Sequence, residues 1–334
     1  MRQFAAVLLL LAATSAGAQT AVIGGTLPAP LPLFPPDNWW NADVSRAPVD
    51  PNSAAYIAFV GPTRGMHPDF GGDSGDPSDP IYGMPYVVVS GQPLVPVTFE
   101  YADESDTAAP GRPPGYPIPE EAKTQPKFIE GGTPGNDPPN DRDRHLLLVD
   151  ADNRILYELY QVWWTGSQWT AGSGAIFSLD SNARRPEGWT SADAAGLAIL
   201  PGLVRYDEVF GPDPIRHAFR VTVRATNGYV FPASHTAGSR SGALPMGARL
   251  RLKSSVDLSR FSPPVQKIFE AMKTYGLIVA DNGSDLYVTG TYDTRWDNDV
   301  LNPAFSSVHG SDFEVVQLGW QPPQARGKHR AAKH

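Results

Sequence analysis

Apolar and polar positions alternate along several short stretches of the chain, which is the pattern of half-buried β-strands. These stretches are rich in β-branched and aromatic residues, and most of them are bounded by Gly, Pro, Asn or Asp. They are residues 84–89, 94–101, 144–150, 154–164, 216–224, 229–232, 249–253 and 285–290. The pattern predicts an all-β fold, mainly antiparallel, arranged as a β-sandwich or jelly roll with a few short helices.

Two stretches show helical signals instead. Residues 262–276 begin with a candidate N-cap, Ser262, followed by prolines in the first turn, and they end at a glycine. Their apolar stripe consists of Val265, Ile268, Phe269, Met272 and Tyr275. The other stretch is residues 188–209. Near its start, Thr190 and Asp193 fit the spacing of a capping box and predict a short capped helix.

Residues 143–164 predict a β-hairpin. A turn centred on residues 152–153 pairs Asp150 with Ile155 and places His145 opposite Tyr160. With an even number of loop residues, His145, Glu158 and Tyr160 share one face of the sheet. A three-residue loop would instead put His145 and Glu158 on opposite faces.

The chain divides into one long segment and several atypical ones. Residues 1–18 combine Arg2, an apolar run and an Ala-Gly-Ala site, which predicts a secretory signal peptide cleaved near Ala18. A proline-rich leader at 19–36 precedes a single globular domain at 37–320, and the basic end at 321–334 predicts a disordered tail. No later apolar run is long enough for a transmembrane helix, so the expected location is extracellular or periplasmic.

Composition excludes several classes of protein. The 334 residues contain no cysteine, which excludes disulfides, thiol nucleophiles and cysteine-ligated zinc. The formal net charge is −8, and losing Arg2 with the leader makes it one unit more negative. Because nucleic-acid binding depends on a basic surface, a nucleic-acid partner is not expected.

Carboxylates placed beside aromatic residues suggest chemistry on carbohydrate. Eight Trp and twelve Tyr residues are available to stack on sugar rings, and glycosidic hydrolysis uses two carboxyl groups. The leading hypothesis is a secreted glycoside hydrolase that cleaves polysaccharide with Glu158 and Asp207 as the carboxylate pair. The expected catalytic residues are Glu158, Asp207, Asp193 and His145, and the expected substrate-binding residues are Trp164, Trp189, Arg205, Tyr206, Tyr160, His217 and His235.

Other functions remain open on the same residues. Arg205, Tyr206, His217 and His235 could serve a polysaccharide lyase, in which Tyr and His transfer protons and Arg neutralises a uronate. A glycan-binding module would need only the aromatic residues. A histidine-ligated metal oxidase is a further alternative, although no histidine pair has a standard ligand spacing. No cofactor is expected to be required; the acidic loops GGDSGDPSDP and DTRWDND are candidates for structural calcium.

Purely structural roles compete with each of these assignments. Asp193 could simply cap its helix, Glu158 could be a solvated strand residue, and single histidines are most often structural. Residues 103–143 show no periodicity and predict one long loop. The sequence leaves the oligomeric state and any metal ligands open.

Motifs spread along the chain resemble a widespread family of secreted bacterial proteins. They are FPPDNWWNADVS, HPDFG, DRHLLLVD, WTSADAAGLAILPGLVRYDE, LPMGARLRLK, YGLIVADNGSDLYVTG, RWDND and GSDFEVV, and they extend from Phe34 to Val316. The resemblance implies one undivided secreted domain. It assigns no reaction and no catalytic residues.

Overall fold

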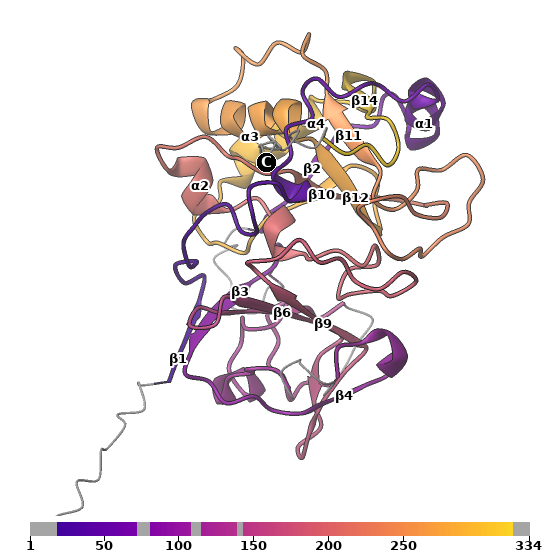
Figure 1. The fold of residues 1–334 in the computed structure, drawn as a ribbon. Coiled ribbons are helices and arrows are strands. Elements are labelled where there is room, and N and C mark those ends of the chain that lie inside the picture. The colour runs from indigo at the N-terminus through magenta and orange to yellow at the C-terminus, as the bar shows by residue number, and fades with distance from the viewer. Residues whose placement is uncertain (1–18, 72–80, 108–114, 139–142, 323–334) are drawn as a thin grey trace, which may run out of the picture.

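The computed structural model describes residues 19–71, 81–107, 115–138 and 143–322. Two large sheets lie in different halves of the molecule (Figure 1). The five-stranded sheet has the order β1 (Thr20–Ile23), β3 (Tyr86–Ser90), β5 (Leu146–Asp150), β6 (Ile155–Tyr160) and β9 (Ser173–Ser178). The six-stranded sheet has the order β14 (Phe313–Val315), β11 (Arg249–Leu252), β12 (Leu277–Asn282), β10 (Phe219–Val223), β13 (Tyr287–Thr289) and β2 (His67–Asp69).

A third, three-stranded sheet has the order β4 (Val97–Phe99), β8 (Trp169–Ala171) and β7 (Trp163–Trp164). The helices are α1 (Ser53–Val60), α2 (Tyr206–Phe210), α3 (Pro263–Thr274) and α4 (Asn298–Ser306). The 3₁₀ turns are η1 (Trp39–Asn41), η2 (Ala102–Glu104), η3 (Glu120–Lys123), η4 (Leu200–Gly202) and η5 (Gly310–Asp312). Among the helices of the described ranges, none combines the length and apolar character needed to span a bilayer.

The fold is β-rich with few helices, as the alternating pattern predicts. Its sheets are mixed, however, because each contains at least one parallel pair: β3 with β5, β10 with β12, and β4 with β8. The prediction of a β-rich fold is therefore confirmed, whereas the prediction that its sheets are mainly antiparallel misses the parallel pairs. The local pattern of a strand does not report the direction of its neighbour, which depends on long connections such as the one from β10 through α3 to β12.

The predicted hairpin is confirmed in its register. Asp150 pairs with Ile155 and Leu147 pairs with Glu158 across β5 and β6. Both faces of β5 are covered: Leu147 belongs to the core that joins the two large sheets, and Leu148 belongs to a second core beneath the five-stranded sheet. Burial on both faces explains why this strand is a continuous apolar run rather than an alternating one.

Helix α3 also agrees with its sequence signals. Ser262 is the N-cap residue and Pro263 opens the first turn. The buried residues of α3 are Val265, Ile268, Phe269, Ala271 and Met272, and they pack into the core shared with the six-stranded sheet. Tyr275, at the C-cap, is only half-buried.

Three local predictions were wrong. Residues 190–198 form turns rather than a capped helix, and residues 229–232 contain one isolated bridge at Tyr229 instead of a strand. Part of the predicted leader is β1, which pairs with β3. Leu33 and Phe34, farther along the leader, are buried in the core. The proline-rich segment is therefore packed against the domain at both of its ends. The signal peptide at 1–18 and nearly all of the tail lie outside the described residues.

Candidate functional site

Glu158 is buried between the two large sheets, and within the part of the chain that the structure describes its carboxylate accepts hydrogen bonds from backbone N–H groups alone. Its carboxylate accepts hydrogen bonds from the N–H groups of Ile199, at 2.8 and 3.0 Å, and Leu200, at 2.9 Å. These N–H groups lie at the start of η4, where a 3₁₀ turn lacks internal partners. Burial raises the pKa of Glu158 to about 7, although the hydrogen bonds from the backbone of Leu200 and Ile199 oppose the rise. Glu158 therefore anchors the 199–202 turn to β6.

Asp207 lies on a different part of the molecule, in the first turn of α2. Its side chain is 60% exposed and approaches Arg205 at 3.5 Å. The neighbouring Glu208 is engaged more tightly: Arg205 donates to it at 2.7 Å, and His217 Nε2 lies 2.9 Å from it. Arg205, Asp207, Glu208 and His217 line a cavity of about 320 Å³, and Glu158 is not part of that lining. The structure thus does not place Glu158 and Asp207 together.

Asp193 is fully buried and faces Arg220 from β10. Arg220 donates through Nη2 to Oδ1 at 2.7 Å and through Nε to Oδ2 at 3.0 Å. Its third donor, Nη1, reaches the Thr289 hydroxyl at 2.7 Å. The Asp193 carboxylate therefore neutralises a buried guanidinium and caps no helix, which corrects the capping-box interpretation.

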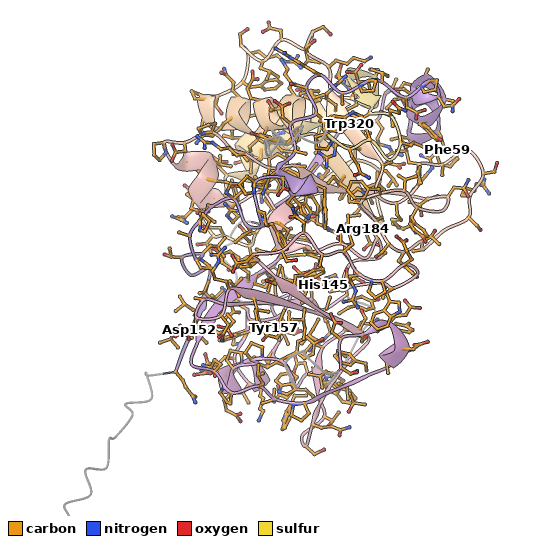
Figure 2. The ribbon with its side chains drawn as sticks, in the orientation of Figure 1. Phe59, His145, Asp152, Tyr157, Arg184 and Trp320 are labelled. Carbon is orange, nitrogen blue, oxygen red and sulfur yellow. The ribbon has the colours of Figure 1, made fainter. Side chains whose placement is uncertain are left out.

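His145 directly precedes β5 and contacts two loops, one at Glu130 and the other at Ala192. Nδ1 contacts Glu130 at 2.5 Å, and Nε2 lies 2.9 Å from the carbonyl oxygen of Ala192. A carbonyl can only accept, and Glu130 is a carboxylate, so both ring nitrogens donate and the ring is an imidazolium. Against the effect of burial, the charge and hydrogen bond of Glu130 raise the pKa of His145 to about 9. Figure 2 shows His145 at the level where the five-stranded sheet meets the loops above it.

Close to these two ion pairs lies an open cavity of about 350 Å³, which we call the Tyr160–Asp281 cleft. Tyr160 ends β6, and Asp281 with Asn282 ends β12. Residues 190–192 and Ala194 form one wall. The ionisable side chains of its described lining are Tyr101, Glu104, Asp143, Tyr160, His235 and Asp281. The cleft thus receives residues from both large sheets and from the loops between them.

Asp281 has the most perturbed carboxyl group in the cleft lining. Its side chain is 25% exposed, and Oδ2 lies 3.8 Å from Arg220 Nη2. Oδ1 accepts the backbone N–H of Asn282 at 2.7 Å. Burial, followed by repulsion from the Asp193 carboxylate, raises the pKa of Asp281 to about 7. A carboxyl group in this state can hold a proton near neutral pH and deliver it into the cleft.

His235 and Glu104 face each other across another part of the lining. His235 Nδ1 lies 2.8 Å from the carbonyl oxygen of Ala194, while Nε2 lies 3.8 Å from Glu104 Oε2. The same oxygen of Glu104 accepts the backbone N–H of Thr190 at 3.1 Å. Both side chains are therefore held in place by backbone groups of the 190–194 wall.

The predicted aromatic residues are distributed over several places. Tyr160 lines the cleft, with its ring 5.5 Å from that of His145. Trp164 packs on Trp169 in the three-stranded sheet, and the Lys123 ammonium lies 3.9 Å from its ring. Trp189 is half-buried next to Thr190 of the cleft wall.

Tyr206 belongs to a third cavity. It stacks on Phe210 at 4.2 Å, and both line a space of about 400 Å³ between α2, α3 and α4. Of the eleven residues expected from the sequence, the cleft lining contains Tyr160 and His235, and its immediate surroundings contain Asp193 and His145.

Within the described ranges, no group of three or more His, Asp and Glu residues could hold an ion. The acidic loop GGDSGDPSDP lies almost entirely outside those ranges. In the second loop, Asp293 binds Arg295 at 2.6 Å, and Asp297 caps α4 by accepting the N–H of Val300.

Of the six ionisable side chains in the described cleft lining, sequence reasoning missed four: Tyr101, Glu104, Asp143 and Asp281. One signal was present for Asp281, because it follows the apolar run 277–280 and so interrupts a buried strand with a charge. Glu104 lies in the aperiodic segment that predicts only a loop, although loops often carry functional residues.

Comparison of the chain with known families, curated sequences and solved structures found no matching family model, no matching sequence and no matching structure. The resemblance to secreted bacterial proteins therefore stays a prediction, and the functional argument rests on the geometry of the cleft.

Proposed function

We propose that this protein is a secreted glycoside hydrolase that binds polysaccharide in the Tyr160–Asp281 cleft and uses Asp281 as its general acid. The observation that carries the proposal is the position of Asp281: its mostly buried carboxyl group, 25% exposed, lines a cleft whose lining also includes Tyr101 and Tyr160. Burial and the nearby Asp193 carboxylate raise the pKa of Asp281, which favours its protonated form. A proton-donating carboxyl group matches the leaving-group oxygen of a glycosidic bond. Tyr101 and Tyr160 supply the flat apolar surfaces on which sugar rings pack.

The charge of the cleft favours hydrolysis over the lyase alternative. Lyases acting on uronates need a cationic group to neutralise the substrate carboxylate. The described lining contains Glu104, Asp143 and Asp281 but no Lys or Arg. Arg220, whose Nη2 lies 3.8 Å from Asp281, is already paired with Asp193. A neutral or amine-bearing glycan therefore fits this lining better than a uronate.

A binding module without catalysis is the second candidate, since the same tyrosines would serve it. The two functions differ in what they require of Asp281. A binding module has no use for a carboxyl group with a raised pKa in its cleft, and placing a charge there costs stability. Perturbed groups of this kind gather at catalytic sites, which favours the enzyme.

The test is turnover on a panel of neutral, amine-bearing and uronate-containing polysaccharides. New reducing ends and the ultraviolet absorbance of unsaturated uronates are measured together. We expect reducing ends without absorbance, and a loss of about 10²- to 10⁴-fold in kcat/KM for Asp281→Asn. Asp180→Asn is the matched control, because Asp180 is 64% exposed and pairs with Arg154 at the surface.

Three outcomes would contradict the proposal. Absorbance accompanying the reducing ends would establish a lyase. Binding without turnover would favour the glycan-binding module. Full activity of Asp281→Asn together with inactive Asp207→Asn would move the catalytic acid from the cleft to Asp207.

A further inference from the structure

His235 has a fixed tautomer in its neutral form. Nδ1 lies 2.8 Å from the carbonyl oxygen of Ala194, and a carbonyl oxygen can only accept a hydrogen bond. The proton of the neutral ring is therefore on Nδ1, and Nε2 carries the free lone pair. Nε2 is the nitrogen that faces Glu104 in the cleft lining. A backbone contact thus turns the basic nitrogen of His235 toward the carboxylate.

The spacing of the two side chains allows one water molecule on the cleft side to bridge them. Nε2 of His235 and Oε2 of Glu104 are 3.8 Å apart, which is too long for a direct hydrogen bond. Both atoms are acceptors. A water molecule about 2.8 Å from each can donate one hydrogen to Nε2 and the other to Oε2. Its lone pairs then point away from both.

A backbone hydrogen bond fixes the Glu104 carboxylate in the position from which it can bind this water. Its Oε2 accepts the backbone N–H of Thr190 at 3.1 Å, and a carboxylate oxygen has a second lone pair for the water. The side chain is 33% exposed, and that of His235 is 25% exposed. Both groups are thus anchored on one side and open on the other, as a water-activating pair requires.

We propose that His235 and Glu104 hold and activate the hydrolytic water, with His235 as the general base and Glu104 as the group that orients the water. This inference rests on the proposed glycoside hydrolase function. His235 Nε2 takes a proton from water, and the water oxygen forms a bond to the anomeric carbon. The bond from that carbon to the leaving oxygen breaks, and the leaving oxygen keeps the electron pair and takes the proton of Asp281. The reaction is a single displacement, so it inverts the anomeric configuration.

The first test is the configuration of the initial product, read by proton NMR on the glycan that the panel identifies. Inversion is expected. Retention would overturn this inference while leaving a hydrolase in place. If the wild type hydrolyses no glycan, the proposed function fails and the water-activating role fails with it.

The second test separates base from acid. His235→Asn keeps an N–H donor at the position of Nδ1 but has no basic nitrogen, so the contact with Ala194 survives. We expect kcat to fall about 10²- to 10⁴-fold with an unchanged melting temperature. The control is His309→Asn, because His309 is 45% exposed at the start of η5.

An aryl glycoside with an acidic leaving group completes the comparison. Such a leaving group needs no proton, so this substrate should restore much of the activity of Asp281→Asn. It should not restore His235→Asn or Glu104→Gln, which lack water activation. Recovery of the His235 variant on this substrate, or full activity of it on the glycan, would overturn the inference. Glu120→Gln, with Glu120 81% exposed, is the control for Glu104.

Discussion

Arg220 and Asp193 form a buried bidentate ion pair close to the cleft, with Nη2–Oδ1 and Nε–Oδ2 distances of 2.7 and 3.0 Å. The pair connects β10 to the turn at residues 190–196, which forms a wall of the cleft. Asp281 contacts the same guanidinium at 3.8 Å. The pair therefore sets the position of the wall and contributes to the electrostatic environment of the proposed acid.

Asp193→Ala should be strongly destabilising. The substitution leaves the Arg220 guanidinium buried without its main partner, and breaking a buried pair in this way costs about 3–5 kcal/mol. Urea denaturation measures the free energy of unfolding. Asp180→Ala removes an exposed partner and should change it by less than about 1 kcal/mol. A change that small for Asp193→Ala would show that the pair does not support the fold.

Glu158→Gln should change how stability depends on pH. Burial raises the pKa of Glu158 from 4.5 to about 7, so the folded protein keeps a proton that the unfolded chain releases. The stability from this proton is complete below pH 4.5 and is lost as the pH rises through 7. Relative to Glu158→Gln, the wild type should lose up to about 3 kcal/mol across this range.

Turnover gives the second readout for Glu158. Because its carboxylate is engaged by the backbone N–H groups of residues 199 and 200 and does not line the cleft, Glu158→Gln should keep measurable activity, whereas the hypothesis of a catalytic Glu158 predicts none. An unfolding free energy whose difference from the wild type does not vary with pH would contradict the assigned pKa.

His145 should be an imidazolium at neutral pH. Its pKa is raised from 6.5 to about 9 by Glu130, so the folded state binds a proton more tightly than the unfolded state. This stabilising contribution is fully present below pH 6.5 and is lost as the pH rises through 9. Nitrogen-15 NMR should show protons on both ring nitrogens at pH 7.5 in the wild type. A neutral ring at that pH would contradict the proposed charge state.

Tyr160→Ala should weaken substrate binding more than Tyr160→Phe. The ring lines the cleft, and loss of an aromatic contact of this kind costs about 0.5–1.5 kcal/mol or more, close to a tenfold rise in KM. The Phe variant keeps the apolar surface and should stay near the wild-type KM. Tyr229→Ala, a change outside the described cleft lining, provides the control. Equal KM values for all three variants would place the sugar elsewhere.

Local parts of the fold could be predicted from the sequence. The hairpin register follows from the strand period of two and a short loop, both of which are properties of residues 143–164 themselves. Helix α3 follows from its cap, its prolines and its apolar stripe. The parallel pairs could not be predicted, because β10 and β12 are adjacent in the sheet but are separated in the sequence by β11 and α3.

The candidate site was only partly predictable for a similar reason. Glu158 was expected beside aromatic residues on an exposed face, but the turn at 199–202 covers that face. The decisive carboxyl groups, Glu104 and Asp281, come from segments nearly 180 residues apart, and their proximity to one cavity depends on how the two sheets are joined. His235 and Tyr160 were identified because loop histidines and strand aromatics are themselves informative.

The most direct measurement of the central claim is the pH dependence of kcat/KM on the glycan that the protein hydrolyses. Asp281 must be protonated to act as the acid, and burial beside Asp193 raises its pKa to about 7. The account predicts that kcat/KM falls as the pH rises through about 7, since the free enzyme then loses that proton. A rate that stays constant well above pH 7 would show that no carboxylic acid with a raised pKa donates the proton, and would contradict the assignment of Asp281.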